Sequence, residues 1–78
     1  NEQAIIDKQG RTWRPDKVFF GEKETIVVDF KLSTSLSDPQ HLTQLRGYMD
    51  FMRQMDLPGV RGYLYYFLQN EMVAVNGI

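Results

Sequence analysis

The run from Thr25 to Phe30 reads Thr-Ile-Val-Val-Asp-Phe, and β-branched side chains occupy its first four positions. Such side chains are stiff at χ1 and pack well on a pleated surface, so the run predicts a β-strand. A strand with so few polar positions is typical of one that has neighbours on both sides, and we expect it to be central. The fold must therefore build a sheet around this strand and accommodate its single acid, Asp29.

The periodicity of apolar residues and the positions of chain-breaking residues divide the rest of the chain into expected strands and a helix. We expect a short apolar stretch at Gln3–Asp7, strands at Thr12–Phe20, Val60–Phe67 and Glu71–Val75, and a helix from near Pro39 to Met55. Pro15 lacks a backbone donor, which indicates an edge position or a bulge beside Asp16.

The expected helix is amphipathic. Leu42, Leu45, Met49 and Met52 recur at steps of three and four residues, which places them on one face. Ser37 or Asp38 can cap the start of the helix with a side-chain oxygen.

These elements predict an α+β fold with the order β-β-β-α-β-β in a single domain spanning residues 1–78. A strand, a crossover helix and another strand usually bring the two strands into parallel pairing. We therefore expect a mixed sheet with the helix packed on one face. Because the chain opens on Asn1, we also expect it to be part of a longer protein.

Composition narrows the classes of site. The chain has 42% hydrophobic residues, no cysteine and a single histidine, His41. Disulfides, thiolate zinc sites and histidine metal cages are excluded, so any metal must be held mainly by oxygen. The longest apolar runs are far shorter than the roughly 20 residues that span a bilayer, and we expect a cytoplasmic protein that does not enter membranes. The net charge of -1 indicates that a nucleic-acid substrate would be held largely by other parts of the parent protein.

Strand register brings two of the acids together. A two-residue or a four-residue turn within Gly21–Glu24 gives the same hairpin register, in which Phe20 faces Thr25 and Asp16 faces Asp29. Like charges directly opposite each other are destabilising, and a divalent cation between them would relieve the repulsion.

Side-chain alternation adds Lys31 to the face that carries Asp29, whereas Ile26, Val28 and Phe30 point to the other face. We expect that apolar face to pack on the helix or on a missing element. Two acids and a lysine suit metal-assisted phosphodiester hydrolysis, in which Mg²⁺ or Mn²⁺ generates the nucleophile from water and the ammonium group stabilises developing charge. A solvated hairpin face, with its acids neutralised by nearby cations, explains the same spacing.

The same residues resemble a known family. Arg14-Pro15-Asp16, followed by Asp29-Phe30-Lys31, is similar to the PD-(D/E)XK nuclease motif, and Gln44 with Tyr48 matches a Gln-x-x-x-Tyr helix signature. Together they resemble the RecB-type nuclease domain at the C-terminus of UvrD/Rep-like helicases. The resemblance covers the chain from about Glu2 onward, but the N-terminal helix usual in the family is missing.

The resemblance implies a magnesium-dependent exonuclease that acts on DNA, joined to helicase (ATPase) domains of the same polypeptide and working in recombination or repair. Asp16 and Asp29 would bind the metal, together with the backbone carbonyl of Phe30, and Lys31 would be the catalytic lysine. Because the N-terminal helix is missing, the resemblance does not extend to activity of this segment alone.

Gln44 and Tyr48 would support the lysine or the DNA strand, although a Tyr on a buried stripe is also an ordinary core residue. We interpret His41 as a cap or surface residue, because it does not match the histidine of the family's first helix. Two alternatives remain open: a non-catalytic module of the same fold that binds DNA or a partner, and a stand-alone endonuclease.

Overall fold

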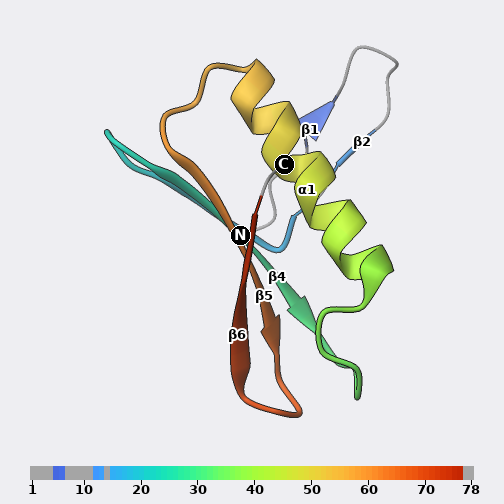
Figure 1. Ribbon diagram of the computed structural model, residues 1–78. Helices are drawn as coiled ribbons and strands as arrows, with labels where there is room; N and C mark the ends of the chain where they lie inside the picture. Colours follow the sequence, from blue (N-terminus) through green and yellow to red (C-terminus); the bar gives the residue numbers. More distant parts are fainter. Residues whose placement is uncertain (1–4, 7–11, 14, 77–78) are drawn as a thin grey trace.

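Strand β4 (Thr25–Lys31) is the centre around which the chain is arranged (Figure 1). In the computed structural model, which describes residues 5–6, 12–13 and 15–76, a four-stranded sheet has the order β3-β4-β5-β6. The remaining elements are β1 (Ile5–Ile6), β2 (Thr12–Trp13), β3 (Lys17–Phe20), α1 (Pro39–Gln54), β5 (Val60–Tyr66) and β6 (Glu71–Val75). The prediction of an α+β chain with a mixed sheet and a helix packed on it is confirmed.

The predicted order β-β-β-α-β-β is wrong at its second strand. The expected strand Thr12–Phe20 is split at Pro15 into β2 and β3, which lie in different sheets because β2 pairs with β1 alone. Pro15 has no N–H to donate, and the N–H of Asp16 donates to a side chain, so the ladder is interrupted there. The observed order within the described residues is β-β-β-β-α-β-β. The expected turn at Gln9–Gly10 and the motif residue Arg14 lie outside the described residues.

The predicted register of the hairpin is confirmed from Lys17 to Phe20, and the expected pair of Asp16 and Asp29 lies just beyond the end of this ladder. β3 pairs antiparallel with β4, with Val18 opposite Val27 and Phe20 opposite Thr25, and β3 is an edge strand. On the other side β4 pairs with β5 in parallel, from Thr25 beside Val60 to Lys31 beside Tyr66. The central position of β4 and the parallel crossover are therefore confirmed.

The helix α1 connects these two parallel strands. The carboxylate of Asp38 caps it by accepting the N–H of Gln40 at 2.8 Å, and Pro39 occupies the first turn, where no backbone donor is needed. The helix ends at Gln54, and Asp56 then adopts a left-handed φ of 59°. No helix within residues 5–6, 12–13 and 15–76 is both long and apolar enough to cross a bilayer.

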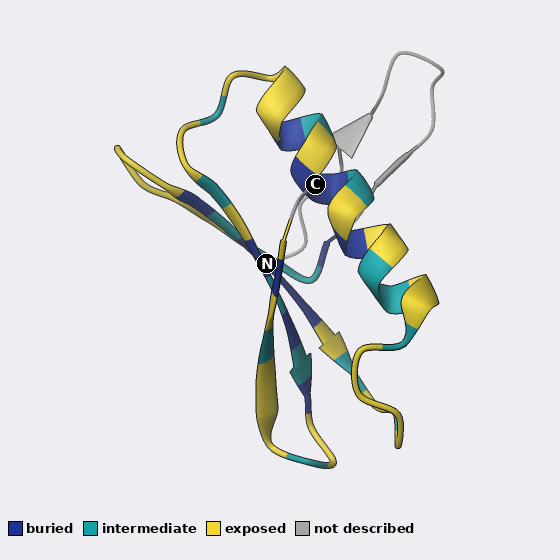
Figure 2. Ribbon diagram, in the orientation of Figure 1, coloured by how far each residue is buried: buried dark blue, intermediate teal, exposed yellow. Residues whose placement is uncertain are grey.

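The core lies between α1 and one face of the four-stranded sheet (Figure 2). Its buried members are Val27, Leu45, Tyr48, Met49, Met52, Leu64, Tyr66 and Val75.

Of the two partners expected for the apolar face of Ile26, Val28 and Phe30, the helix is not the one observed. Val27 belongs to this core, so the helix covers the face that carries Asp29 and Lys31, while Ile26, Val28 and Phe30 lie on the opposite face. Alternation along a strand shows which residues share a face. The crossover between β4 and β5 is nearly always right-handed, so the side taken by the helix depends on which edge of β4 pairs with β5, and alternation does not encode that choice.

Close packing of α1 on β5 depends on Gly62. A Cβ built on Gly62 would collide with the sulfur of Met49 and would lie 3.2 Å from the Cδ2 of Leu45. Both of these helix residues are buried in the core. The absence of a side chain at Gly62 therefore lets the helix lie directly on the strand.

We expect Gly62→Ala to destabilise the protein by about 2 kcal/mol, because the added methyl group overpacks the contact with Met49. Urea denaturation followed by circular dichroism would measure the change. Ala74→Ser, at an exposed position on the neighbouring strand, is the matched control and should alter stability by less than about 0.5 kcal/mol. Equal stability of Gly62→Ala and the parent protein would contradict the tight contact.

Candidate functional site

The candidate site lies where β4 loses one of its two neighbours. The antiparallel ladder with β3 stops at the pair Lys17 and Val28, whereas the parallel ladder with β5 continues to Lys31 and Tyr66. The last three residues of β4 are therefore paired along one edge only. Their other edge faces the residue that precedes β3, which is Asp16.

Asp16 and Asp29 hold each other in place through backbone donors. The N–H of Asp16 donates to Oδ1 of Asp29 at 3.1 Å, and the N–H of Phe30 donates to Oδ2 of Asp16 at 2.9 Å. Hydrogen bonds from N–H groups to a carboxylate are charge-assisted and therefore strong. The two carboxyl groups also share a side-chain hydrogen-bond interaction, and Oδ1 of Asp16 and Oδ2 of Asp29 accept no backbone N–H among the described residues.

The environment of Asp29 disfavours its charge. The side chain is only 3% exposed, and this burial is the main reason that the pKa of the carboxyl is raised above its ordinary value. The nearby Asp16 carboxylate raises this pKa further, while the N–H of Asp16 and the Lys31 ammonium group lower it. A cation beside the two acids would favour the charged carboxylate and so oppose the effects that raise the pKa.

Lys31 supplies a positive charge without closing off the carboxylate. Its Nζ donates to Oε1 of Gln44 at 2.9 Å and lies 3.9 Å from Oδ2 of Asp29, which is beyond hydrogen-bond distance. The Lys31 side chain is 21% exposed, so the ammonium group remains accessible. Gln44, one turn into α1, thus holds the lysine beside the acids.

Phe30 contributes its backbone, while its ring lies on the other face of the sheet. In a strand the N–H and C=O of one residue point to the same side, so the carbonyl of Phe30 faces the edge where Asp16 accepts its N–H. The ring contacts Tyr65 and Phe67, with centroids 6.3 Å and 5.5 Å away. This carbonyl is therefore available beside the two acids.

The donor set fits a hard cation. Two carboxylate oxygens and a backbone carbonyl are oxygen ligands of the kind that Mg²⁺ and Mn²⁺ take, and Mg²⁺ normally keeps several waters. Within the part of the chain that the structure describes, no group of three or more His, Cys, Asp or Glu side chains is placed to hold a metal. An ion here would therefore depend on water and substrate for its remaining ligands.

Tyr48, the second residue of the helix signature, is 5% exposed and belongs to the core cluster with Val27 and Leu45. It lies one turn after Gln44 on α1. Of the five side chains proposed for the site, Asp16, Asp29, Lys31 and Gln44 are therefore linked by direct contacts, and Tyr48 packs beneath the helix.

Sequence reasoning missed a contact beside this site. Nδ1 of His41 lies 3.1 Å from the hydroxyl oxygen of Tyr66, and this fully buried tyrosine is the β5 neighbour of Lys31. His41 precedes Gln44 by three residues, a spacing that places both on one side of the helix. That spacing, combined with the parallel register, was the available signal.

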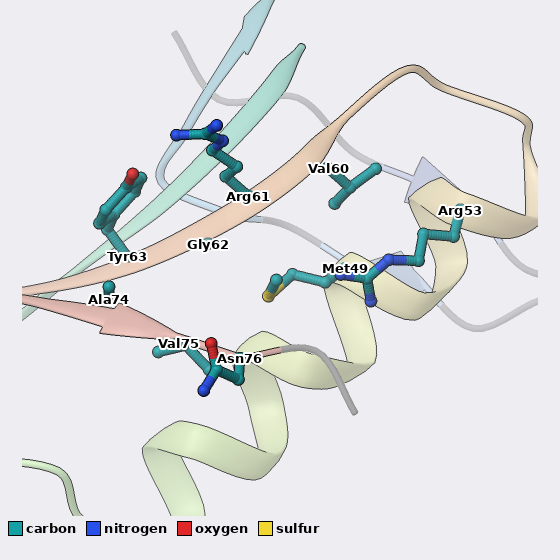
Figure 3. Close-up of a pocket in the computed structure, with 9 residues that line it drawn as sticks. All are labelled: Met49, Arg53, Val60, Arg61, Gly62, Tyr63, Ala74, Val75 and Asn76. Carbon is teal, nitrogen blue, oxygen red and sulfur yellow. The ribbon is translucent and has the colours of Figure 1, made fainter.

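A separate hollow of about 260 Å³ lies between the C-terminal half of α1, the start of β5 and the end of β6 (Figure 3). The residues that line it are Met49, Arg53, Val60, Arg61, Gly62, Tyr63, Ala74, Val75 and Asn76. No carboxylate lines it, and neither do Asp16, Asp29, Phe30, Lys31, Gln44 or Tyr48, the residues expected at the metal and catalytic site. The candidate site is therefore the open strand edge and not this hollow.

We expect Asp29→Asn to stabilise the protein at neutral pH by about 1 kcal/mol, because it removes a buried charge while keeping Oδ1 as an acceptor for Asp16. A carboxyl whose folded-state pKa is raised contributes stability at acid pH, and this contribution is lost as the pH rises through that pKa. The advantage of the variant should therefore shrink on acidification. Thermal melts at about pH 7 and about pH 4 would measure it.

The exposed helix residue Asp50 provides the matched control, and Asp50→Asn should change stability by less than about 0.5 kcal/mol at either pH. If Asp29→Asn were less stable than the parent protein at neutral pH, the account of a strained, buried carboxylate would be wrong.

Comparison with known proteins does not place this chain in a family. No family model matches the chain, and no match was found among curated proteins or among solved structures. The geometry of the strand edge is therefore the basis on which its function is inferred.

Proposed function

We propose that this chain is a metal-dependent deoxyribonuclease of the PD-(D/E)XK type, similar to RecB-type nuclease domains, which hydrolyses DNA phosphodiester bonds with Mg²⁺ or Mn²⁺. Asp16, Asp29 and the carbonyl of Phe30 hold the ion in this proposal. Lys31 is the catalytic lysine, and Gln44 and Tyr48 support it.

One observation carries the proposal. The reciprocal hydrogen bonds between the two acid segments orient both carboxylates and leave one oxygen on each without a backbone N–H, with the Lys31 ammonium group 3.9 Å from one of them. If these residues formed only a solvated hairpin face, neither the burial of Asp29 nor the hydrogen bonds from the backbone to the two carboxylates would be expected. Burying a carboxylate close to another is costly, and such costs are concentrated at functional sites.

The residues of the chain divide the chemistry among them. Lys31 orients the attacking water or stabilises charge that develops on the phosphate, as fixed cations do in a preorganised site. Gln44 holds the ammonium group beside Asp29, with which it forms a long ion pair of 3.9 Å and no direct hydrogen bond. A bound Mg²⁺ supplies the acidity that makes water a nucleophile near neutral pH. The backbone donors keep both carboxylates in place before substrate arrives.

The proposed parent protein and its partners rest on the same resemblance to RecB-type nuclease domains. The chain acts as the exonuclease part of a cytoplasmic helicase–nuclease in DNA recombination or repair, with helicase (ATPase) domains of the same polypeptide as its partners. With a net charge of -1, the chain has little general attraction for phosphate backbones, which favours a partner domain that delivers the DNA.

The direct test is DNA degradation by the full-length natural polypeptide. We expect Lys31→Met to lower the Mg²⁺-dependent rate by about a hundredfold or more, because it removes the ammonium group while keeping a similar side-chain volume. Release of labelled nucleotides from a DNA substrate would measure this rate. Asp29→Asn should abolish it by removing a metal ligand.

Lys23→Met, in the exposed turn between β3 and β4, is the matched control and should leave the rate unchanged. Undiminished degradation by both Lys31→Met and Asp29→Asn would show that the nuclease activity does not reside in this site.

The described residues also favour a second candidate, a non-catalytic module of the same fold that binds DNA or a partner, since they contain no metal-binding group of three acidic, His or Cys side chains. Titration calorimetry of the full-length protein with Mg²⁺ and Mn²⁺ separates the two. Heat of binding that is lost in Asp29→Asn supports the nuclease, whereas its absence in the parent protein supports the non-catalytic module.

A further inference from the structure

The hydroxyl of Tyr66 joins β5 to the segment that leads into α1. Its oxygen accepts the N–H of Ser37 at 3.0 Å and lies 3.1 Å from Nδ1 of His41. Tyr66 is fully buried, so its polar atom needs these partners. The residue thus ties the start of the helix to the strand that runs beside Lys31.

The roles in the contact between His41 and Tyr66 depend on the tautomer of the imidazole. The oxygen of Tyr66 accepts the N–H of Ser37, and the tyrosine proton, which is buried, also needs an acceptor. The tautomer in which Nδ1 of His41 accepts that proton satisfies both groups. In the neutral imidazole with Nδ1 accepting, the ring proton is on Nε2.

The other ring nitrogen of His41, Nε2, forms no hydrogen bond with the described residues. Among these residues the contacts of His41 are its hydrogen bond and its ring contact with Tyr66, so Nε2 has no partner in this part of the chain. His41 is half-buried, and Nε2 is not among the buried polar atoms that lack a partner, so it reaches solvent. In the tautomer with the proton on Nε2, an N–H donor that reaches solvent is thus held in a fixed direction.

This donor lies on the same side of the sheet as the candidate site. Gln44 bonds to Lys31 on β4, and His41, one turn earlier on α1, bonds to Tyr66 on β5. Lys31 and Tyr66 are register partners, and adjacent strands are about 4.8 Å apart. The first turn of α1 carries no acidic residue, and the acid at its start, Asp38, is engaged in capping the N–H of Gln40.

We propose that His41 is a DNA-binding residue of this site, whose Nε2–H donates to a phosphate oxygen next to the phosphodiester that is cleaved. Tyr66 is a positioning residue that fixes the imidazole. The inference rests on the proposed nuclease function, because it takes its substrate from that function. It adds a contact to DNA that needs neither the metal nor the cleavage step.

Equilibrium binding in EDTA tests the contact apart from catalysis. The full-length polypeptide is titrated into a fluorescein-labelled single-stranded oligonucleotide at about pH 8, and the anisotropy gives Kd. We expect His41→Ala to raise Kd by about tenfold, as the loss of a hydrogen bond to a charged group would do. His41→Gln, which retains an N–H donor, should recover part of the affinity.

Tyr66→Phe should raise Kd by a smaller factor, and the double variant should bind no more weakly than His41→Ala, because Tyr66 acts through His41. A neutral donor releases no counterion of its own, so the dependence of log Kd on log salt should keep its slope in His41→Ala. Thermal melts of each variant separate loss of contact from loss of fold.

Thr43→Ala, at an exposed position on the same helix, is the matched control and should leave Kd unchanged. The proposal is overturned if the parent protein binds no DNA. It is also overturned if the Kd of His41→Ala stays within twofold of the parent value, or if His41→Ala raises Kd only as much as Thr43→Ala does. Binding that depends on His41 without Mg²⁺-dependent cleavage would refute the nuclease and retain this contact. Mg²⁺-dependent cleavage together with an unchanged Kd and KM in His41→Ala would retain the nuclease and refute the contact through His41.

Discussion

The unequal pairing of strand β4 is the constraint from which the rest of the molecule follows. Its antiparallel ladder with β3 ends at Val28, while its parallel ladder with β5 continues to Lys31. The residues between these two points are held rigidly by β5 but have an open edge on the β3 side. A side chain can therefore approach the backbone of β4 there, and Asp16 does so.

Pro15 explains why the open edge begins where it does. The residue is buried and has no N–H, so the strand that contains Thr12 and Trp13 does not continue directly into β3. The N–H of Asp16 is thereby directed to the carboxylate of Asp29. A local interruption of the ladder thus creates the reciprocal lock between the two acids.

The site is assembled at a cost that the core must offset. Asp29 is buried beneath the helix beside another carboxylate, and the raised pKa of its carboxyl reflects that environment. The packing of α1 on β4 and β5, made possible by the small residue at Gly62, supplies the apolar burial on the same face. Structural stability and the candidate site therefore share one side of the sheet.

The sequence by itself determined β4, the helix and the register of the hairpin. The β-branched run of β4, the cap at Asp38 and the apolar stripe of α1 are local signals, and a hairpin register is set by its turn, so the approach of Asp16 to Asp29 beyond the end of the ladder could be predicted. Only the tertiary structure decided which face the helix covers, because the crossover has a nearly fixed hand but side-chain alternation does not say on which edge of β4 the strand β5 pairs. It also decided that Pro15 breaks the second strand and that His41 meets Tyr66, since both depend on where backbone and side-chain hydrogen bonds find their partners in space.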